Sequence, residues 1–109
     1  MTLAVVSPAT FEALQILGAA VKTERLRRKW SIKELAQRVA VSHPTVMKIE
    51  RGDPSVAIGT VFEAAVVVGV TLFDADPIVR SRQLGHLRSD LALLPKAGRM
   101  SSIVADDDF

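Results

Sequence analysis

The stretch SIKELAQRVAVSHPTVMKIERG, residues 31–52, decides the fold of this chain. It opens with Ser31, a good N-cap, and Glu34 three positions later completes a capping box. The pattern therefore predicts a helix that begins directly after Ser31. One face of this helix is apolar and carries Leu35, Ala36 and Val39. The side chain of Ala36 is small enough to let a second helix cross closely.

A second short helix follows with almost no connector. Ser42 is its N-cap, and Val46 and Ile49 give it an apolar face of its own. Gly52 supplies the left-handed residue that ends this helix, and Asp53-Pro54 strengthens that prediction. Two capped helices within 22 residues indicate a helix-turn-helix, an arrangement whose second helix can enter a major groove of DNA.

The composition favours one small domain with a tail. The chain has 109 residues, and 49% of them are hydrophobic, which is ample for a compact core. It contains no cysteine, which excludes disulfides and thiolate metal sites. The N-terminus lacks a basic region, and the longest apolar run is far shorter than the roughly 20 residues of a membrane span. We therefore expect a soluble, cytoplasmic protein.

Positive charge is concentrated on the helix-turn-helix. The formal net charge is +2, but residues 22–51 contain nine Lys/Arg against three Glu. Residues 52–109 contain five Lys/Arg against eight Asp/Glu. Basic side chains that neutralise phosphates release counterions and drive association with nucleic acid. We therefore expect the motif to bind DNA and the acidic C-terminal half to serve another purpose.

Further core helices are predicted on both sides of the motif. Ser7-Pro8 is an N-cap followed by proline and begins a helix over residues 8–28. A helix over residues 58–68 ends at Gly69, and residues 70–73 close a five-helix core through a short turn or helix. The core residues expected from these helices are Leu14, Leu17, Val21, Leu26, Val61, Phe62, Ala65 and Val66.

A separate helix follows the core, because Asp76-Pro77 begins one and Pro95 ends it. The apolar positions that we expect on one stripe are Ile78, Leu84, Leu87, Leu91 and Leu94. A lone exposed helix does not need so many leucines, so this face is expected to pack on the same chain, on a second copy or on another partner. The predicted organisation is a DNA-binding domain over residues 1–74, a helical segment over 75–95 and a flexible acidic tail over 96–109.

The ordered residues of the motif carry a family resemblance. They are Leu17-Gly18, Arg25-Leu26-Arg27-Arg28, Glu34-Leu35-Ala36, Val41-Ser42, Val46, Ile49-Glu50-Arg51-Gly52 and Val70. This set resembles the xenobiotic-response-element (XRE, Cro/repressor-like) helix-turn-helix family. The resemblance implies an all-α, lambda-repressor-like five-helix DNA-binding domain, here with an extra C-terminal helix and an acidic tail. Ala40 departs from the family, which often has glycine in this turn, and left-handed alanine costs roughly 1 kcal/mol relative to glycine.

The same resemblance implies where DNA is bound. His43, Pro44 and Lys48 match base-facing positions of the family, and Lys48 is the best match for a guanine O6/N7 contact. Ser31 lies at a helix N-terminus, where an anion such as a phosphate is favoured. The expected DNA-binding residues are Ser31, Lys33, Ser42, His43, Pro44, Thr45, Met47, Lys48 and Arg51, with Arg27 and Lys29 as further phosphate contacts.

No catalytic constellation emerges from the sequence. Arg25 and Glu50 match the family's buried ion pair between the first and third helices, which is a structural feature. His43 and His86 stand 43 positions apart with no carboxylate at ligand spacing. The glycines form no phosphate-binding loop. We expect no metal, no cofactor and no enzymatic activity.

The C-terminal part resembles HipB-type antitoxins, which pair with HipA-type serine/threonine kinase toxins. The resemblance comprises the Asp-Pro-started helix, Leu94-Pro95-Lys96 and the terminal Asp-Asp-Asp-Phe, although Ala97-Gly98-Arg99-Met100 stands where a more basic run is expected. It implies a homodimeric repressor of a two-fold-symmetric operator that also binds the toxin. The expected partner-binding residues are Leu87, Leu91, Leu94, Asp106, Asp107, Asp108 and Phe109. Two alternatives remain open, a stand-alone phage or metabolic repressor and an interaction adaptor that does not bind DNA.

Overall fold

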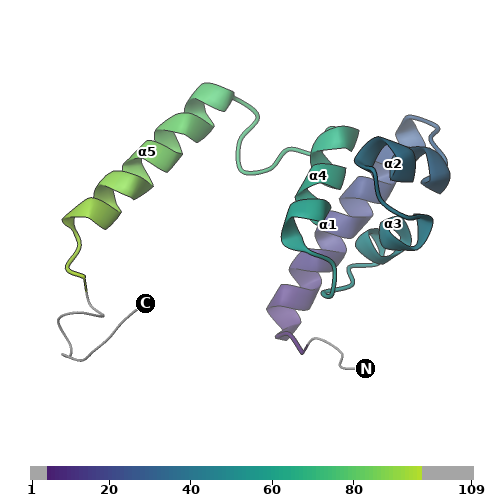
Figure 1. Cartoon of the computed structure of the whole chain (residues 1–109), viewed down its shortest axis with the longest axis horizontal. Coiled ribbons are helices and arrows are strands. Elements are labelled where there is room, and N and C mark those ends of the chain that lie inside the picture. Colours follow the sequence, from purple (N-terminus) through teal and green to yellow (C-terminus); the bar gives the residue numbers. More distant parts are fainter. Residues whose placement is uncertain (1–4, 97–109) are drawn as a thin grey trace. The chain divides into compact units, whose positions relative to one another are not determined.

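The structure is a computed structural model that describes residues 5–96, and within them it contains five α-helices and no strand (Figure 1). The helices are α1 (Pro8–Arg27), α2 (Ile32–Val39), α3 (His43–Glu50), α4 (Ile58–Val68) and α5 (Pro77–Leu93). The chain divides into two compact units, Met1–Leu72 and Phe73–Phe109. The all-α fold that the sequence predicts is confirmed.

Side-chain caps begin both helices of the motif. The Ser31 hydroxyl accepts from the Glu34 N–H at 3.0 Å, and the Glu34 carboxylate accepts from the Ser31 N–H at 2.7 Å, so the capping box at the start of α2 is complete. The Ser42 hydroxyl accepts from the Thr45 N–H at 3.3 Å at the start of α3. Both predicted N-caps are confirmed. Each satisfies a backbone donor that the first turn of a helix cannot pair internally.

Left-handed residues end both helices. Ala40 caps α2 with φ 62° and ψ 47°, as the sequence predicts. Its N–H donates to the Gln37 carbonyl at 3.3 Å. Gly52, with φ 78°, follows α3. The turn at Ala40 leaves only residues 40–42 between α2 and α3, so the two helices are held as a tight pair.

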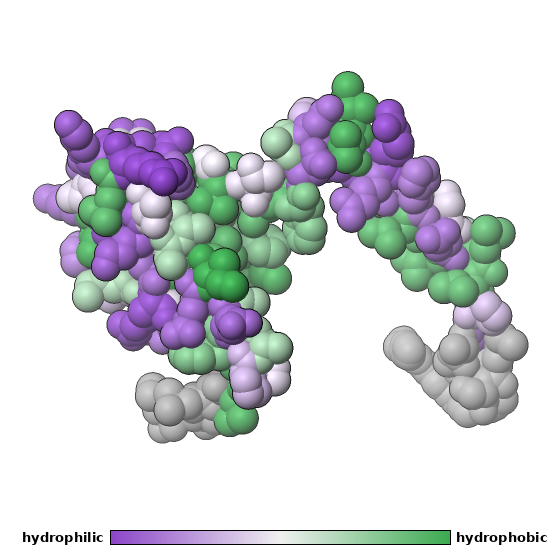
Figure 2. All heavy atoms as spheres, turned by 180° about the vertical axis from the view of Figure 1, so that it is seen from behind, coloured by the Kyte–Doolittle hydropathy of each residue, from purple (hydrophilic) through white to green (hydrophobic). Residues whose placement is uncertain are grey.

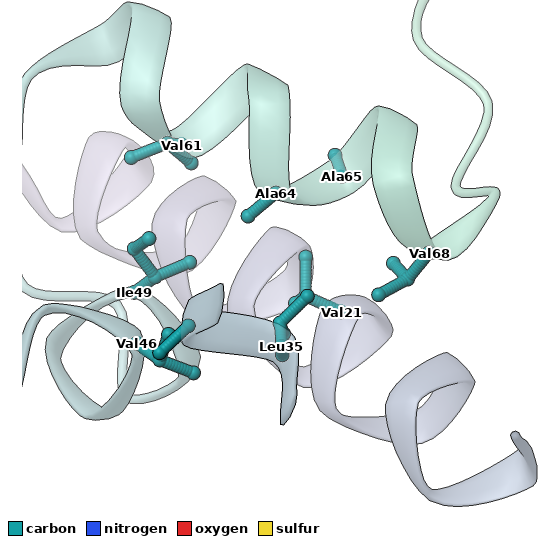
Figure 3. Packing of buried hydrophobic residues seen from close by; sticks show 9 residues of the cluster. Val21, Leu35, Val46, Ile49, Val61, Ala64, Ala65 and Val68 are labelled. Carbon is teal, nitrogen blue, oxygen red and sulfur yellow. The ribbon is translucent and has the colours of Figure 1, made fainter. Parts of the chain in front are cut away.

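The core of the first unit lies between α4 and the other three helices. Figure 3 shows Val61, Ala64, Ala65 and Val68 of α4 on one side and residues of α1, α2 and α3 on the other. The fully or nearly fully buried hydrophobic residues are Val21, Leu35, Ala36, Val46, Ile49, Val61, Ala64, Ala65 and Val68. The helices pack in the pairs α2–α3, α1–α3, α1–α4 and α2–α4. This arrangement fixes the motif on a rigid support.

Two residues predicted in the core are exposed instead. Leu26 is 56% exposed and Val66 is 59% exposed. At 3.6 residues per turn, each lies about 140° around its helix from a buried valine, Val21 in α1 and Val61 in α4. The inward position at the end of α1 belongs to Arg25, which is buried. Hydrophobicity alone therefore gave the wrong face at these two positions.

The first unit contains four helices, one fewer than the five-helix core that the sequence predicts. Residues 70–73 are not helical, and Val70 and Leu72 pack partly buried against the core. Aspartate side chains compete with a helix just beyond them. The Asp74 carboxylate accepts from the Asp76 N–H, and that of Asp76 accepts from the Ile78 N–H, both at 2.8 Å. The fifth helix of the chain is α5.

The second unit is described by α5, which begins at the predicted N-cap Asp76 and ends before Pro95. Every residue of α5 is exposed. Leu84, Leu87, Leu91 and Leu94 share one face, but Ile78 lies about 120° around the helix from Leu84, so it is not part of the predicted stripe. No helix within residues 5–96 is long and apolar enough to cross a membrane.

Candidate nucleic-acid interface

The two faces of α3 have opposite character. Val46 and Ile49 are buried in the core cluster, where α3 packs against α1 and α2, and they anchor the helix. Exposed side chains occupy the outward positions, spaced three or four residues apart so that they form one ridge. We call this set the α3 ridge, and its members are His43, Pro44, Met47, Lys48 and Arg51. It presents the Lys48 ammonium, the Arg51 guanidinium beyond the helix end and the His43 imidazole to the solvent.

The start of α3 is fixed by its cap. The Ser42 hydroxyl lies 2.8 Å from the Thr45 hydroxyl and also accepts the Thr45 N–H. Thr45 is half-buried, so it is less accessible than its predicted partners on the α3 ridge. Pro44 lacks an N–H and leaves no donor unpaired there. The first turn of α3 is thus rigid, as a surface that meets base edges has to be.

The N-terminus of α2 carries both signs of charge. The pKa of the Glu34 carboxyl is lowered, chiefly because the backbone N–H of Ser31 donates to it, with smaller contributions from the Ser31 hydroxyl and Arg38. That N–H is therefore already paired and is not available to a phosphate. Lys33 is exposed beside it and is the cation of this turn. A phosphate contact by Ser31 through its hydroxyl stays a prediction.

Arg51, at the end of α3, has a nearby carboxylate. Its Nη2 lies 3.5 Å from Oδ2 of Asp53. The pKa of Asp53 is lowered, first by the Ser55 hydroxyl and then by the Ser55 N–H, which donate to it at 2.6 and 2.8 Å. Asp53 is thus a fixed anion close to Arg51. The long ion-pair distance leaves the Arg51 guanidinium able to turn toward a phosphate.

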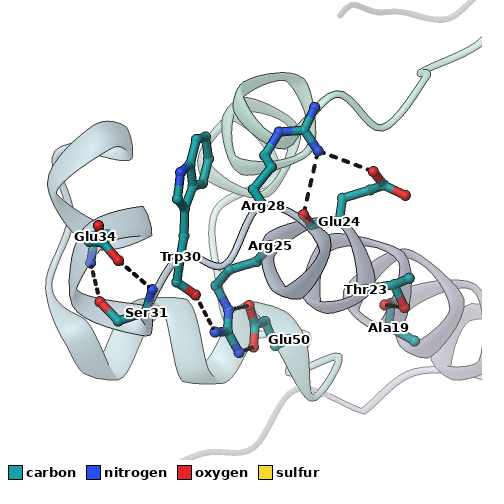
Figure 4. A network of polar contacts seen from close by, with 9 residues as sticks. All are labelled: Ala19, Thr23, Glu24, Arg25, Arg28, Trp30, Ser31, Glu34 and Glu50. Atoms are coloured by element: carbon teal, nitrogen blue, oxygen red, sulfur yellow. Dashed lines mark hydrogen bonds and ion pairs between the residues drawn. The ribbon is translucent and has the colours of Figure 1, made fainter.

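A buried ion pair joins the end of α1 to the end of α3 (Figure 4). Arg25 Nε donates to Glu50 Oε2 at 2.7 Å, and Nη2 donates to Oε1 at 3.0 Å. Nη1 donates to the Trp30 carbonyl at 2.9 Å. The two charged side chains are 7% and 6% exposed. The structure brings together the pair that the sequence singled out, and the pair ties α3 to the segment that leads into α2.

One comparison decides the family. The helix-turn-helix domain family matches residues 16–76, just over half of the chain. The chain belongs to the helix-turn-helix domain family. Membership agrees with the XRE-like resemblance of the motif and indicates a DNA-binding regulator rather than an enzyme. A comparison with curated proteins finds no match.

The helix-turn-helix domain contains a close approach to which the sequence assigned no role. Gly18 of α1 lies against the last turn of α3. A methyl group added there would meet the Ile49 carbonyl oxygen and, at 2.7 Å, the Glu50 carbonyl oxygen. Only glycine lets the two helix backbones come so close. A lone glycine inside a helical pattern is a weak sign of such packing.

An arginine–tryptophan stack in the helix-turn-helix domain was also missed. The Arg38 guanidinium lies 4.0 Å from the centre of the Trp30 ring, and that of Arg28 lies 5.7 Å from it. Arg28 is held in turn by Glu24, at 3.1 Å (Figure 4). These cation–π contacts join Trp30 to residues two and eight positions away, and no spacing rule predicts them. They fix the segment between α1 and α2.

The remaining predicted site residues fall outside this surface. Arg27 is exposed and pairs with Glu24 at 2.6 Å, and Lys29 is exposed with φ 59°. The predicted partner-binding leucines lie in the second unit, Leu87 and Leu91 on α5 and Leu94 at its C-cap. The acidic residues Asp106, Asp107 and Asp108, with Phe109, lie outside the described residues. Within residues 5–96 no group of His, Cys, Asp or Glu could hold a metal ion.

Proposed function

We propose that this DNA-binding regulator is a sequence-specific transcriptional repressor that binds a two-fold-symmetric operator as a homodimer. The observation that carries the proposal is the α3 ridge, an exposed set of side chains on a helix held rigidly by the core. Lys48 forms no ion pair with any residue that the structure describes, so its charge is available to DNA. The positive excess over residues 22–51 attracts the phosphate backbone to the same domain.

The proposed contacts divide into base readout and positioning. Lys48 donates to guanine O6 or N7, Pro44 or the Thr45 methyl meets a thymine methyl, and His43 donates to guanine N7 or to a phosphate. Positioning on the phosphate backbone falls to exposed polar groups at the end of the α3 ridge and outside it. They are Ser31, Lys33, Ser42 and Arg51, with Met47 filling the ridge between base contacts.

We propose a homodimer because α3, the helix that contacts the bases under this proposal, is short. α3 has eight residues, and its outward ridge can cover only a few base pairs in one major groove. Proteins with this motif reach specificity by placing two such helices in successive grooves about 34 Å apart. A two-fold-symmetric operator with half-sites one helical turn apart is the geometric consequence.

To test this proposal, the full-length chain is used to select the DNA duplexes that it binds from a pool of random sequences. The selected duplexes are then sequenced. The proposal predicts an enriched site with two inverted half-sites whose centres lie about 10 base pairs apart, or a multiple of one turn. A pool that shows no enrichment after several rounds, at a salt concentration where binding is detected, would contradict sequence-specific repression. An enriched single half-site would contradict the symmetric homodimer.

We further propose that the repressor is the antitoxin of a HipA-like serine/threonine kinase toxin and represses the operon they share. The resemblance of the C-terminal segment to HipB-type antitoxins supports this. The exposed leucines of α5 add support, since they offer a partner an apolar surface on a helix other than α3. Under this proposal the toxin is bound by the acidic terminal residues 106–109.

The antitoxin proposal is tested by co-purification of the untagged chain with the product of the adjacent gene. The full-length chain is compared with a version truncated after Arg99. Loss of a kinase-like partner on truncation supports the proposal and assigns the binding of that partner to the terminal residues. Operator binding with no partner would contradict the antitoxin role and leave a stand-alone repressor.

A further inference from the structure

The α3 ridge combines cations with an exposed apolar strip. Met47 is 44% exposed, and Pro44, three positions earlier, is exposed as well. Side chains at this spacing are neighbours on a helix surface, so the two form one apolar strip along the ridge. Lys48 stands beside Met47 and one turn after Pro44. On a helix that meets base edges, this mixture of groups determines which atoms of the bases can be bound.

The three carboxylates in and directly after the motif are engaged within the protein. The Glu34 carboxylate accepts from the backbone N–H at the start of α2 at 2.7 Å. That of Glu50 is paired with Arg25 and is only 6% exposed. That of Asp53 accepts from the N–H and the hydroxyl of Ser55 at 2.8 and 2.6 Å. None of these carboxylates belongs to the α3 ridge, so the ridge has no anionic acceptor for an amino group of a base.

Amide side chains are absent from α3. An asparagine or glutamine amide reads adenine by pairing with its N6 amino group and its N7. The chain contains no asparagine, and its glutamines lie on α1, α2 and α5, at Gln15, Gln37 and Gln83. The Gln15 side chain packs against Gly52, beyond the end of α3. The reading helix therefore lacks the side chains that bind adenine in this way.

The polar groups that remain on α3 are mainly donors. The hydroxyls of Ser42 and Thr45 are hydrogen-bonded to each other at 2.8 Å. Lys48 and Arg51 carry several donors and no acceptor, and the neutral ring of His43 has one accepting nitrogen. An amino group of adenine or cytosine brought against Lys48 would place donor against donor. Such a contact weakens binding, because neither group then keeps a hydrogen-bond partner.

We propose that α3 reads its half-site through N7 and O6 of guanine and through thymine methyl groups, and not through the amino groups of adenine or cytosine. This inference rests on the proposed repressor function and names the chemistry of its operator. Lys48 reads guanine, and Met47 covers a thymine methyl and is a specificity-determining residue. Every G·C pair contains a guanine and every A·T pair a thymine, so these groups suffice to distinguish the base pairs in the major groove.

The apolar strip has the size of a base-pair step. Pro44 and Met47 lie about 4.5 Å apart along the helix axis, compared with about 3.4 Å between successive base pairs. The flexible thioether of Met47 can adapt to the position of a methyl group. Figure 2 shows hydrophobic side chains gathered over the C-terminal half of α5 as well. The strip on α3 differs from these side chains, because the helix-turn-helix family indicates DNA as the partner of its domain.

The test measures, by fluorescence anisotropy, the affinity of the full chain for its selected operator with single altered bases. Deoxyuridine in place of thymidine removes one methyl group, and 7-deazaguanine in place of guanine removes the N7 acceptor. 2-Aminopurine in place of adenine removes the N6 amino group and keeps N7. The same replacements outside the half-sites are the controls.

The proposal predicts a different result for each altered base. Deoxyuridine at one thymine of each half-site weakens binding about fourfold, the factor expected for one buried methyl group. 7-Deazaguanine at one guanine of each half-site weakens binding about tenfold or more, because a hydrogen bond to a charged group is lost. 2-Aminopurine leaves the affinity unchanged at every adenine.

Two variants assign these effects to single side chains. Met47→Ala loses its sensitivity to deoxyuridine at the thymine concerned and keeps its sensitivity to 7-deazaguanine. Lys48→Ala shows the opposite pattern. Both side chains are exposed, so both variants keep the fold, which a thermal unfolding curve checks. Equal losses of affinity in the two variants, with both sensitivities retained, would overturn the assignment, because neither side chain then contacts the altered group.

The outcomes separate this inference from the repressor function on which it rests. A selection that enriches no duplex would contradict sequence-specific repression, and the inference would fall with it. An enriched operator that tolerates deoxyuridine at every thymine would overturn the inference alone. Weaker binding with 2-aminopurine would also overturn it, and disappearance of that effect in His43→Ala would assign the reading of adenine to the imidazole.

Discussion

Removal of the Glu50 carboxylate by Glu50→Ala leaves a buried cation without its partner. The Arg25 guanidinium makes two hydrogen bonds to this carboxylate, at 2.7 and 3.0 Å, and its side chain is only 7% exposed. The third hydrogen bond of the guanidinium is to the Trp30 carbonyl, a neutral group that cannot compensate the positive charge of Arg25. Water cannot reach the guanidinium freely, so the folded chain bears the cost of the unpaired charge.

The size of the stability loss in Glu50→Ala follows from the burial of the Arg25–Glu50 ion pair. Breaking a buried ion pair by removing one partner costs about 3–5 kcal/mol. A domain of this size has a total free energy of unfolding of about 5–15 kcal/mol. A loss of that size lowers the Tm by about 12 °C or more, at about 4–8 °C per kcal/mol for a domain of 60–100 residues.

The assay is urea denaturation followed by tryptophan fluorescence. The chain has one tryptophan, Trp30, whose carbonyl accepts a hydrogen bond from Arg25. The exposed Glu63→Ala variant is the matched control and changes the free energy of unfolding little. The double variant Arg25→Met/Glu50→Leu removes both charges. Its free energy of unfolding falls by only about 1–3 kcal/mol, chiefly because the Trp30 carbonyl loses its hydrogen-bond donor. A Glu50→Ala variant within about 1 kcal/mol of wild type, or a double variant less stable than the single one, would refute the reasoning.

Three further predictions concern stability. Gly18→Ala forces a methyl against the α3 backbone and lowers the free energy of unfolding by about 1–3 kcal/mol, whereas Gly59→Ala, with no atom within 4 Å of the added methyl, is neutral or stabilising in the same denaturation assay. Ala40→Gly relieves a left-handed alanine and raises stability by up to about 1 kcal/mol; an unchanged or lower thermal midpoint would count against strain at this turn. The pKa of Glu34 is lowered mainly by the Ser31 N–H, so its carboxylate stabilises the fold above the ordinary glutamate pKa, and that stabilisation is lost as the pH falls through the lower, folded value. Glu34→Gln should therefore flatten the acid limb of a stability-against-pH curve, and an unaltered limb would contradict this account.

The local features of the fold could be predicted from the sequence. The caps at Ser31 and Ser42 and the left-handed turns at Ala40 and Gly52 were predicted, because capping depends on residues within one turn of each other. The end of α4 was predicted for the same reason, from Gly69. The outward positions of the α3 ridge follow from these bounds and from helical periodicity.

Features that depend on contacts distant in the sequence could not be predicted in the same way. Leu26 is exposed because Arg25 takes the inward position, and that choice is set by Glu50, 25 residues later. The stack of Arg38 on Trp30 and the close approach at Gly18 depend on how the helices pack. The sequence left residues 70–73 open as a short turn or a helix, and the choice against a helix reflects half-buried packing of two side chains and the competing aspartate turns beyond them.

The most direct test of the central claim is the affinity of the full chain for its selected operator, measured by fluorescence anisotropy for the wild type, Lys48→Ala and Arg82→Ala. Both variants remove one positive charge, but Lys48 lies on the α3 ridge and Arg82 lies on α5. The account predicts that Lys48→Ala weakens operator binding by about 5- to 150-fold and reduces discrimination against a scrambled duplex, since a good base contact contributes about 1–3 kcal/mol. It predicts that Arg82→Ala leaves the affinity unchanged. Equal effects of the two substitutions, or an unaltered discrimination in Lys48→Ala, would contradict DNA reading by α3.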